Sequence, residues 1–460
     1  MKTNVLSLFA LLSILFFAAC ASEDAAKQDS IQEPDTDGLT AFVVEDNSTK
    51  TRTTADYDGS GINFYWTAGD RLWVNDAMLK QDVRNTINNN LENHPTMPTT
   101  AVKRVATAKF YFNGTFTGAS YPVRYTGKNS TAGDKVTIKA QQNQNVPNDA
   151  SHLGESGDCG TATAIQSGGR YNFTLDHKAA YLTFIPYSTQ EVVREGVITE
   201  IQVTVNSYAL VGQFNFDDTG IVLSSRPAAN STNRTISLKL NNFPIPSGMD
   251  ATKNAAIMVL PPGSYNRVTV TYIIHSPITN MSGKIYKDYT GITLTAGKNK
   301  KVSTDLQVTD YSSQSIQSFS ATNGCPNVNE CWWYFATNRT YWDNLLWAYK
   351  GHLYANGMWF MKKQYISGFN AANFKGGDMS LNPEYEKKPT ASARPRPVDR
   401  DKFFFMPALG NGTSGMGAVG RYWTSNDRFD AMAYVWAFSE TYVGVGNNYK
   451  FLAMPLWTTQ

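Results

Sequence analysis

Short stretches in which apolar and polar residues alternate recur along residues 39–308, and they predict β strands. The segment Ile201–Val205 (IQVTV) alternates strictly, and turn-forming residues separate such stretches about every ten positions. This spacing of short strands is typical of β sandwiches, so we predict a mainly β fold. The other predicted strands are Leu39–Val44, Ile62–Trp66, Arg71–Val74, Lys109–Phe112, Val123–Tyr125, His177–Phe184, Gly212–Phe216, Ile257–Pro262, Arg267–Tyr272 and Ile292–Lys298.

The last third of the chain has a different pattern, because aromatic residues dominate it. Eight of the ten tryptophans lie between Trp332 and Trp457. We therefore predict a separate module here, carried by the part of the chain that precedes it. Aromatic residues that alternate along a strand most often build a small core. Trp423 and Trp436 are accordingly predicted to be buried.

The composition suits a folded extracellular β protein of two to four domains. Of the 460 residues, 42% are hydrophobic and only 17% are charged, and the formal net charge is +3. So small a charge argues against nucleic acid or an anionic membrane surface as a partner. Basic residues cluster only at 394–402 and 298–301, and both clusters are predicted to be solvated loops.

The N-terminus has the features of an export signal. Lys2 supplies a positive charge, and the apolar run Val5–Ala19 is too short to span a membrane comfortably. Small residues then precede Cys20, which resembles a bacterial lipobox. The resemblance implies a signal peptide at residues 1–19 and lipidation of Cys20, whereas a plain secretory signal that contains a cysteine is the other interpretation.

The stretch that follows Cys20 is acidic and polar. Residues 20–38 contain Pro34 and show no periodicity, so a lipidated tether is predicted. The sequence Ser22-Glu23-Asp24 resembles the surface-export signal of lipoproteins in anaerobes of the Bacteroidales type. The resemblance implies a lipoprotein that the lipid anchors to the outer membrane and that faces the cell exterior.

The other cysteines, Cys159, Cys325 and Cys331, are odd in number and cannot all pair. Cys325 and Cys331 flank a short loop that a disulfide could close in an exported protein. Two free thiols in a core are the other interpretation. No metal site is predicted, because the chain has no CxxC motif and its five histidines are dispersed.

Two blocks of sequence carry a family resemblance. The first, TRT…FYWTAGDRLWV at residues 51–74, contains W-x-A-G-D between two strands, which are predicted to pair as a hairpin. The second has HKAAYLTF, VLPPG, VTVTY and LTAGK in that order over residues 177–298. Both resemble the fimbrillin-like (Mfa-like) family of surface lipoproteins and pilins. The resemblance implies two tandem Greek-key β-sandwich domains, at residues 39–175 and 176–308.

A second resemblance concerns the C-terminal module at residues 319–460, which a predicted polar linker at 309–318 precedes. The module contains FFMPALG at 404–410, GRYWTS at 420–425 and AYVWAF at 433–438. This order resembles the FISUMP-type domain of bacterial surface proteins. The resemblance implies an α+β recognition module similar to C-type-lectin-like folds.

We find no catalytic constellation and expect no enzyme activity, no metal and no cofactor. The motifs G-x-S-x-G and H-E-x-x-H and a Walker loop are absent. Asp427 and Asp430 could form a carboxylate pair or bind calcium, but the tripeptides E-P-N and Q-P-D of calcium-dependent lectins are also absent. The candidate ligand contacts are these two aspartates with Trp342 and Trp347, which are predicted to lie in loops.

The fimbrillin-like resemblance implies a function in adhesion. Such pilins lose their first strand when a trypsin-like protease cuts after a basic residue, and a strand from another subunit fills the groove. Here Leu39–Val44 would be that strand, and Lys50 and Arg52 are the candidate processing sites, although a solvated loop is the other interpretation. Because the C-terminal module stands where a stalk pilin keeps its donor strand, we expect a pilus tip subunit that accepts a strand from another pilin. The alternative is a permanently anchored glycan-binding lipoprotein; the ligand, a host or bacterial glycan or protein, is left open.

Overall fold

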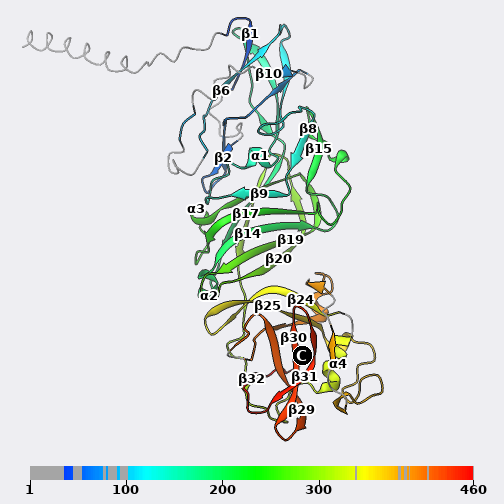
Figure 1. Ribbon diagram of the computed structural model, residues 1–460. Coiled ribbons are helices and arrows are strands. Elements are labelled where there is room, and N and C mark those ends of the chain that lie inside the picture. The colour runs from blue at the N-terminus through cyan, green and yellow to red at the C-terminus, as the bar shows by residue number, and fades with distance from the viewer. Residues whose placement is uncertain are drawn as a thin grey trace, which may run out of the picture.

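The computed structural model is an elongated molecule in which β sheets succeed one another from the N-terminal end to the C-terminal module (Figure 1). The fold is mainly β with several sheets, as predicted. None of its described helices is long and apolar enough to cross a bilayer. The structure describes residues 36–44, 54–75, 79–80, 87, 91–93, 102–336, 339–381, 385–387, 391–392, 394–411 and 414–458.

The N-terminal sheet surrounds β1 (Leu39–Val44), which lies between β11 (Arg170–Asn172) and β6 (Ala108–Asn113). Beyond β11 the order is β10 (Gly160–Ser167), β7 (Ser120–Tyr125), β4 (Trp73–Val74) and β5 (Leu79–Lys80), with β12 (Asp176–His177) paired to β10. The core beneath this sheet is aromatic, because inward-facing positions of the alternating strands carry rings. Its fully buried members include Phe42, Trp66, Phe110, Phe112 and Tyr125.

The W-x-A-G-D motif forms a turn that carries the chain from one sheet to another. The buried carboxylate of Asp70 accepts hydrogen bonds from the Thr67 amide at 2.8 Å and the Tyr125 hydroxyl at 3.0 Å. Before the turn, β3 (Ile62–Tyr65) pairs with β2 (Thr54–Tyr57), whereas β4 after it pairs with β7. The predicted hairpin between these segments is therefore wrong, because the buried aspartate satisfies the turn without requiring its two arms to pair.

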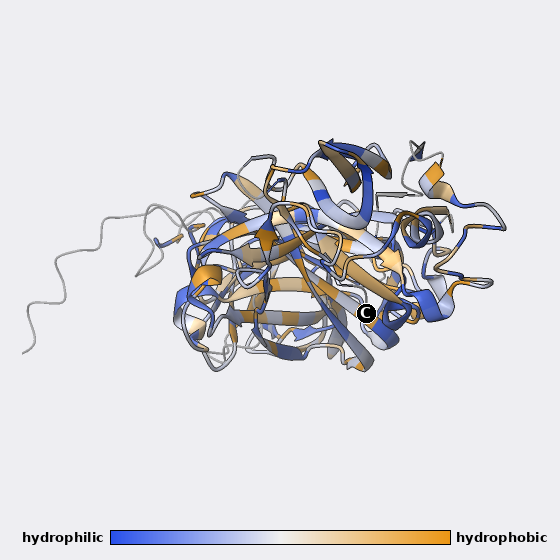
Figure 2. Ribbon diagram, turned by 90° about the horizontal axis from the view of Figure 1, so that it is seen from below, coloured by the Kyte–Doolittle hydropathy of each residue, from blue (hydrophilic) through white to orange (hydrophobic). Residues whose placement is uncertain are grey.

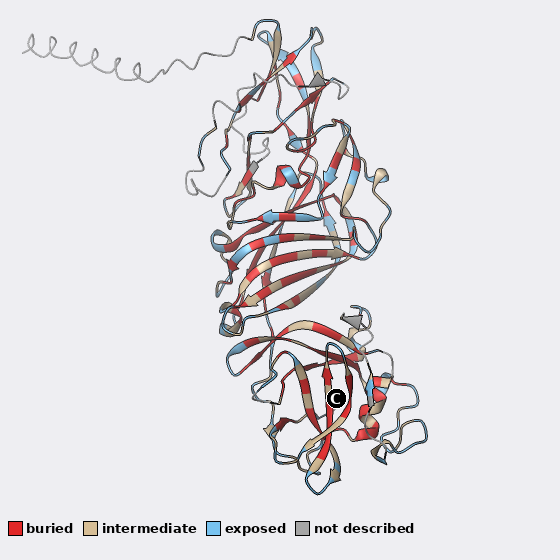
Figure 3. Cartoon of the chain, viewed as in Figure 1, coloured by how far each residue is buried: buried red, intermediate tan, exposed pale blue. Residues whose placement is uncertain are grey.

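The middle of the molecule is a sandwich with one large core. Its larger sheet has the order β20-β19-β14-β17-β9, and its smaller sheet has the order β18-β13-β21. Buried and exposed bands alternate along the larger sheet (Figure 3), as expected where one face meets a core. The strands are β9 (Gln141–Gln144), β13 (Ala180–Tyr187), β14 (Val197–Val205), β17 (Thr235–Pro244), β18 (Ala256–Leu260), β19 (Gly263–Ser276), β20 (Met281–Leu294) and β21 (Asn299–Asp305). Beside them lie β8 (Lys135–Ile138), β15 (Gly212–Asp217), β16 (Gly220–Ile221), α1 (Leu153–Ser156), α2 (Glu191–Arg194), η2 (Leu223–Ser225) and α3 (Ala251–Asn254).

The chain crosses between the first two cores more than once. Tyr57 and Phe64 of the β2–β3 hairpin pack in the core of the middle sandwich, and so do Val136 and Ile138 of β8. The predicted division at residue 175 is therefore not how the cores divide. The physical reason is that strands far apart in the sequence pair with each other. Strand β8 pairs with β15, and β9 pairs with β17.

In the described part of the chain, the C-terminal module has two larger sheets, a small two-stranded sheet and one longer helix, α4 (Val328–Ala336). Seen from below in Figure 2, hydrophobic and hydrophilic bands alternate along many strands of the molecule. One sheet has the order β26 (Tyr385–Lys387), β31 (Val443–Tyr449), β30 (Met432–Ser439) and β29 (Val419–Phe429). The other has β28 (Phe403–Pro407), β25 (His352–Met361) and β24 (Tyr341–Tyr349), with β27 (Ala391–Ser392) paired to β24. Three short 3₁₀ turns are η3 (Lys363–Tyr365), η4 (Met379–Leu381) and η5 (Arg400–Lys402).

The segment 309–318 is built into this module rather than forming an unpaired linker. In it, β22 (Thr309–Asp310) pairs with β24, and β23 (Ile316–Gln317) pairs with β32 (Met454–Pro455). The ring of Tyr311 also packs edge-on against Trp347, with ring centroids 6.1 Å apart. Polar composition alone predicted a linker, but backbone pairing does not depend on apolar side chains.

Candidate functional site

The first candidate site is the groove that β1 fills in the N-terminal sheet. All six residues of β1 pair with β6 in antiparallel register, from Leu39 opposite Asn113 to Val44 opposite Ala108. On its other side β1 pairs with β11 in parallel register at Phe42 and Val43. A strand that is paired on both sides would leave an open slot of unpaired amide and carbonyl groups if it were removed.

The floor of this groove is a set of aromatic rings gathered around Phe42, whose side chain is fully buried. The Phe42 ring stacks on Tyr171 with centroids 4.9 Å apart and an interplanar angle of 13°. It meets Phe112 and Phe116 edge-on, each with centroids 5.1 Å apart. Any strand that replaced β1 would have to place an apolar side chain in this position.

The chain that follows the predicted processing sites is held by the core of the middle sandwich, whereas β1 is held by the core of the N-terminal sheet. The amide of Tyr57 donates to the Asn148 carbonyl at 2.9 Å, and the amide of Ala150 donates to the Ala55 carbonyl at 2.8 Å. The ammonium of Lys301 donates to the carbonyl of Gly59 at 2.9 Å. The connection between Val44 and Thr54 therefore joins a strand of the N-terminal sheet to a hairpin of the middle sandwich.

Three predicted site residues lie outside the described residues. These are the lipidation site Cys20 and the processing sites Lys50 and Arg52. They remain predictions from the sequence.

Trp342 and Trp347, predicted as ligand contacts, are core residues instead. Their exposed fractions are 6% and 0%. The indole of Trp347 donates to the Asn356 carbonyl at 2.9 Å, and its ring stacks on Tyr354 with centroids 5.1 Å apart. The prediction was wrong because both residues lie on β24, within a sheet rather than in a loop. Both side chains belong to the core of the module.

Asp427 and Asp430 lie at the end of the β29–β30 hairpin, where Lys450 holds both. The ammonium of Lys450 is 2.7 Å from a carboxylate oxygen of Asp427 and donates to the Asp430 carbonyl at 3.2 Å. In the described part of the chain, no group of three or more acidic, histidine or cysteine side chains is arranged to hold a metal ion. The structure thus brings the two aspartates together with a lysine.

Cys325 and Cys331 are buried free thiols in this structure, so the disulfide that was one interpretation is not formed. Cys331 lies on α4 with its side chain in the aromatic core, and Cys325 precedes that helix. Burial raises the pKa of the Cys325 thiol to about 11 and that of Cys331 well above its ordinary value. Thiols in such a setting are poor nucleophiles. Cys159 is likewise buried and free.

The YWTSN segment at residues 422–426 has a structural role. The Tyr422 hydroxyl donates to the Pro407 carbonyl at 2.6 Å, and the Trp423 indole donates to the Gln317 carbonyl at 2.9 Å. The side-chain oxygen of Asn426 accepts from the amide of Val328 at the start of α4. Trp423 and Trp436 are each 1% exposed, which confirms that they are core residues.

The middle sandwich and the C-terminal module share a junction that the sequence did not reveal. The sheet continues between them, because β20 pairs with β24 in parallel at Lys284 and Leu345. At Gly283 a Cβ atom would lie 2.6 Å from the Leu346 side chain and 2.9 Å from Ala355, so the two parts approach closely. The module is therefore attached through a sheet rather than through a flexible connection.

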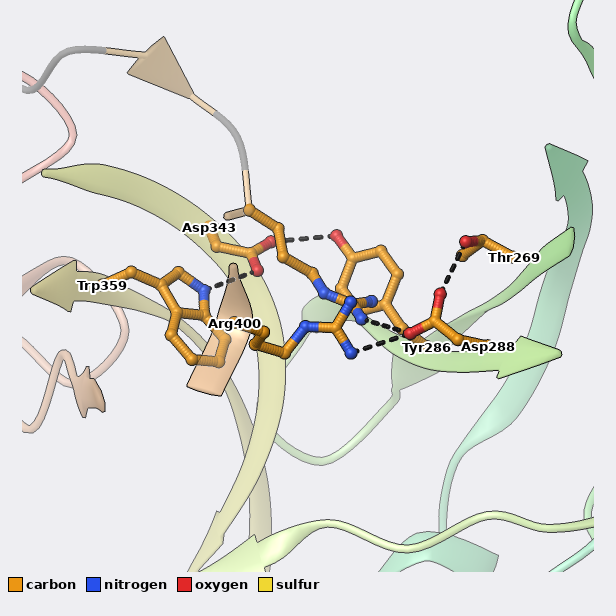
Figure 4. A network of polar contacts seen from close by, with 7 residues as sticks. Thr269, Tyr286, Asp288, Asp343, Trp359 and Arg400 are labelled. Carbon is orange, nitrogen blue, oxygen red and sulfur yellow. Dashed lines mark hydrogen bonds and ion pairs between the residues drawn. The ribbon is translucent and has the colours of Figure 1, made fainter. Parts of the chain in front are cut away.

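A polar network reinforces this junction (Figure 4). Asp288 of β20 accepts hydrogen bonds from the Thr269 hydroxyl at 2.6 Å and from Arg394 and Arg400 at 2.8 and 2.7 Å. Burial opposes ionisation of Asp288, but the Thr269 hydroxyl and the two guanidinium groups hold the pKa of its carboxyl below the usual value. The Arg394 guanidinium also lies 3.9 Å from the centre of the Tyr286 ring.

A second carboxylate extends the network into the module. Asp343 of β24 accepts hydrogen bonds at 2.9 Å from both the Tyr286 hydroxyl and the Trp359 indole. Burial, and then the charge of Asp343, raise the pKa of Tyr286. The prediction of a solvated loop at residues 394–402 was therefore wrong for Arg394 and Arg400, whose partner Asp288 lies more than a hundred residues away in the sequence.

We expect Asp288→Asn to lower the free energy of unfolding of the C-terminal module by about 2 kcal/mol, since two guanidinium groups lose their shared counter-charge in a partly buried site. Chemical denaturation followed by tryptophan fluorescence would measure this loss, because the module contains eight of the ten tryptophans. The control is Asp399→Asn. Asp399 is as exposed as Asp288, but its partners Arg396 and Lys402 are 81% and 44% exposed, against 10% and 28% for Arg394 and Arg400. It should cost under about 0.5 kcal/mol, and equal losses would contradict the role assigned to the junction.

Comparison with known proteins adds little to this picture. No family model and no curated protein sequence matches the chain. A solved candidate cell adhesion protein from Bacteroides ovatus aligns at 11% identity over 58% of this chain and 91% of its own, with a TM-score of 0.32. One from Bacteroides fragilis aligns at 12% identity over 58% and 88%, with a TM-score of 0.30. A fimbrial protein from Bacteroides ovatus aligns at 11% identity over 91% and 98%, with a TM-score of 0.20. At these scores the likeness carries no argument about this chain.

Proposed function

We propose that this protein is a surface lipoprotein of the fimbrillin-like type whose β1 strand is a removable plug and whose C-terminal module binds a ligand in adhesion. The observation that carries the proposal is the position of β1 inside the N-terminal sheet, paired on both sides. The sequence between β1 and β2 contains Lys50 and Arg52, so one cut there would leave β1 held only by non-covalent contacts.

What happens after such a cut depends on which core holds the chain on each side of it. The hairpin that starts at Thr54 belongs to the middle sandwich and is bonded to Asn148 and Ala150. It would stay folded when β1 leaves. The vacated slot would then offer the backbone groups of β6 and β11 together with the aromatic floor around Tyr171, which suits a strand with an apolar residue at the position of Phe42.

A position at the tip of a fibre is supported by the C-terminal module. Its last described strand, β32, already pairs with β23, and the amide of Leu456 donates to the Ser315 carbonyl at 2.9 Å. A segment that is paired within its own module is not available to fill the groove of a neighbour. The protein would therefore accept a strand from another pilin and present its module at the end of the fibre.

The mature N-terminus of the protein from its native cell surface tests this proposal. We expect material that begins at Thr51 or Thr53. If all the material instead begins at lipidated Cys20, the polymerising function is excluded, and the second candidate function stands: a permanently anchored lipoprotein that binds glycans. A pocket of about 320 Å³ beside α4 in the C-terminal module favours this alternative.

A second experiment tests the plug in the purified protein. After digestion with trypsin, a labelled peptide with the sequence of β1 should exchange into the N-terminal sheet. The double variant Lys50→Ala, Arg52→Ala should resist this exchange because its loop remains uncut. Equal exchange in the uncut variant would show that the groove opens without processing. It would contradict the proposal that cleavage is what releases β1.

A further inference from the structure

The C-terminal module has a pocket of about 320 Å³ beside α4 that no part of the proposed strand exchange uses. Helix α4, the end of β25 and the two loops that follow β25 form its walls. Its volume lies at the small end of the range for ligand sites, about 300–1,000 Å³. Its lining residues include Trp333, Arg339, Met361, Tyr365, Ser367 and Lys375.

The pocket has an apolar floor and a polar rim. Trp333, Met361 and Ile366 are less than 9% exposed and form the floor. At the rim, Tyr365 is 44% exposed, and Lys375 is exposed as well. An apolar floor with polar groups around its edge suits a ligand that has an apolar face and a polar periphery.

The segment that carries Phe374 and Lys375 is anchored to α4. The indole of Trp333 donates to the carbonyls of both Asn370 and Asn373, each at 2.9 Å. The rings of Trp333 and Phe374 meet edge-on with centroids 4.9 Å apart. These contacts fix the loop that carries Lys375, so the pocket does not have to be ordered by its ligand.

The described residues that line the pocket carry charge of one sign. None of the nine described lining residues is acidic, whereas Arg339 and Lys375 are cationic. The ammonium of Lys375 lies 5.3 Å from the centre of the Phe374 ring, at the edge of the pocket. Burial, and then the charge of Lys375, lower the pKa of Lys387, which indicates a third cation nearby. Such a field favours an anionic ligand.

We infer that this pocket binds a single acidic sugar residue, whose ring lies on the aromatic and apolar floor and whose carboxylate meets Lys375 and Arg339. The C–H face of a pyranose ring is flat and apolar enough to pack on an aromatic ring, and its hydroxyl groups suit the rim at Tyr365 and Ser367. The inference rests on the proposed role of the module in recognition and names the class of ligand that the module takes.

Titration of the purified protein with N-acetylneuraminic acid and with D-glucuronic acid tests the inference, with D-glucose as the neutral sugar and glutarate as the acid without a ring. We expect both acidic sugars to bind, more weakly at higher salt concentration. Lys375→Gln should weaken this binding about five- to tenfold, because it removes a charge-assisted contact. Tyr365→Ala should weaken it about threefold or more through lost ring contact.

The matched control is Lys363→Gln, which removes the same charge from an exposed lysine on η3 that does not line the pocket. It should leave the affinity unchanged. Equal binding of glucose and glucuronic acid would overturn the role of the charge, and equal binding of glutarate would overturn the role of the sugar ring. Absence of binding by both acidic sugars would overturn the inference as a whole. The proposed function would survive each of these results, because the mature N-terminus tests it independently.

Discussion

Replacement of Phe42 by alanine is expected to lower the free energy of unfolding of the N-terminal sheet by about 3–5 kcal/mol, because it leaves a cavity at the centre of an aromatic cluster. Phe42 is fully buried and contacts Tyr171, Phe112 and Phe116. Hydrogen exchange followed by mass spectrometry would measure the loss on the peptides of β6 and β11, which pair with β1.

Phe429→Ala is the matched control, since it removes the same ring from a site that is 60% exposed. It should change stability by no more than about 0.5 kcal/mol. If Phe42→Ala were equally mild, the groove would not depend on this ring. The substitution should also speed the exchange of a β1 peptide into the trypsin-treated protein, because the resident strand is then held by backbone hydrogen bonds with less apolar contact.

Replacement of Gly420 by alanine is expected to destabilise the C-terminal module by about 3 kcal/mol. Gly420 pairs with Phe438 across β29 and β30, and a Cβ atom at Gly420 would lie 2.2 Å from the phenyl ring. The fully buried Phe438 ring has little room to move, because it stacks on Tyr422 with centroids 5.9 Å apart. This contact gives a physical reason for the glycine in the G-x-YW motif.

The control is Gly446→Ala, which makes the same change in β31 of the same sheet. A Cβ atom at Gly446 would meet no other atom within 4 Å, so we expect no loss and a small gain from the lower chain entropy of alanine. Thermal unfolding followed by tryptophan fluorescence compares the two. Similar melting temperatures for both variants would show that Phe438 adapts to the added methyl group.

Much of the fold was predictable from the sequence, because alternation along a strand is local information. The strands β1, β6, β7 and β14 lie where alternating or aromatic segments predicted them, and so does the core position of Trp423 and Trp436. The groove around β1 was predictable only in part. Its strand was evident, whereas its pairing partners β11 and β6 come from distant parts of the chain.

The same limit explains the site residues that were wrong or missed. Trp342 and Trp347 were assigned to loops because their segment, YWDNLLWAY, does not alternate cleanly, yet pairing with β25 makes it a strand. The ion pairs of Asp288 with Arg394 and Arg400 had no signal in the sequence, because a short basic cluster is most often solvated.

The sequence by itself determined many of the strands, among them β1, β6, β7 and β14, and the core positions of Trp423 and Trp436, since alternation along a strand depends on neighbours within a few positions. Only the tertiary structure decided how the cores divide, that a continuous sheet joins the middle sandwich to the C-terminal module, and that Lys375 lies beside Trp333 at a pocket. These features depend on pairing between segments that are far apart along the chain, and residue patterns within one segment carry no information about its distant partner.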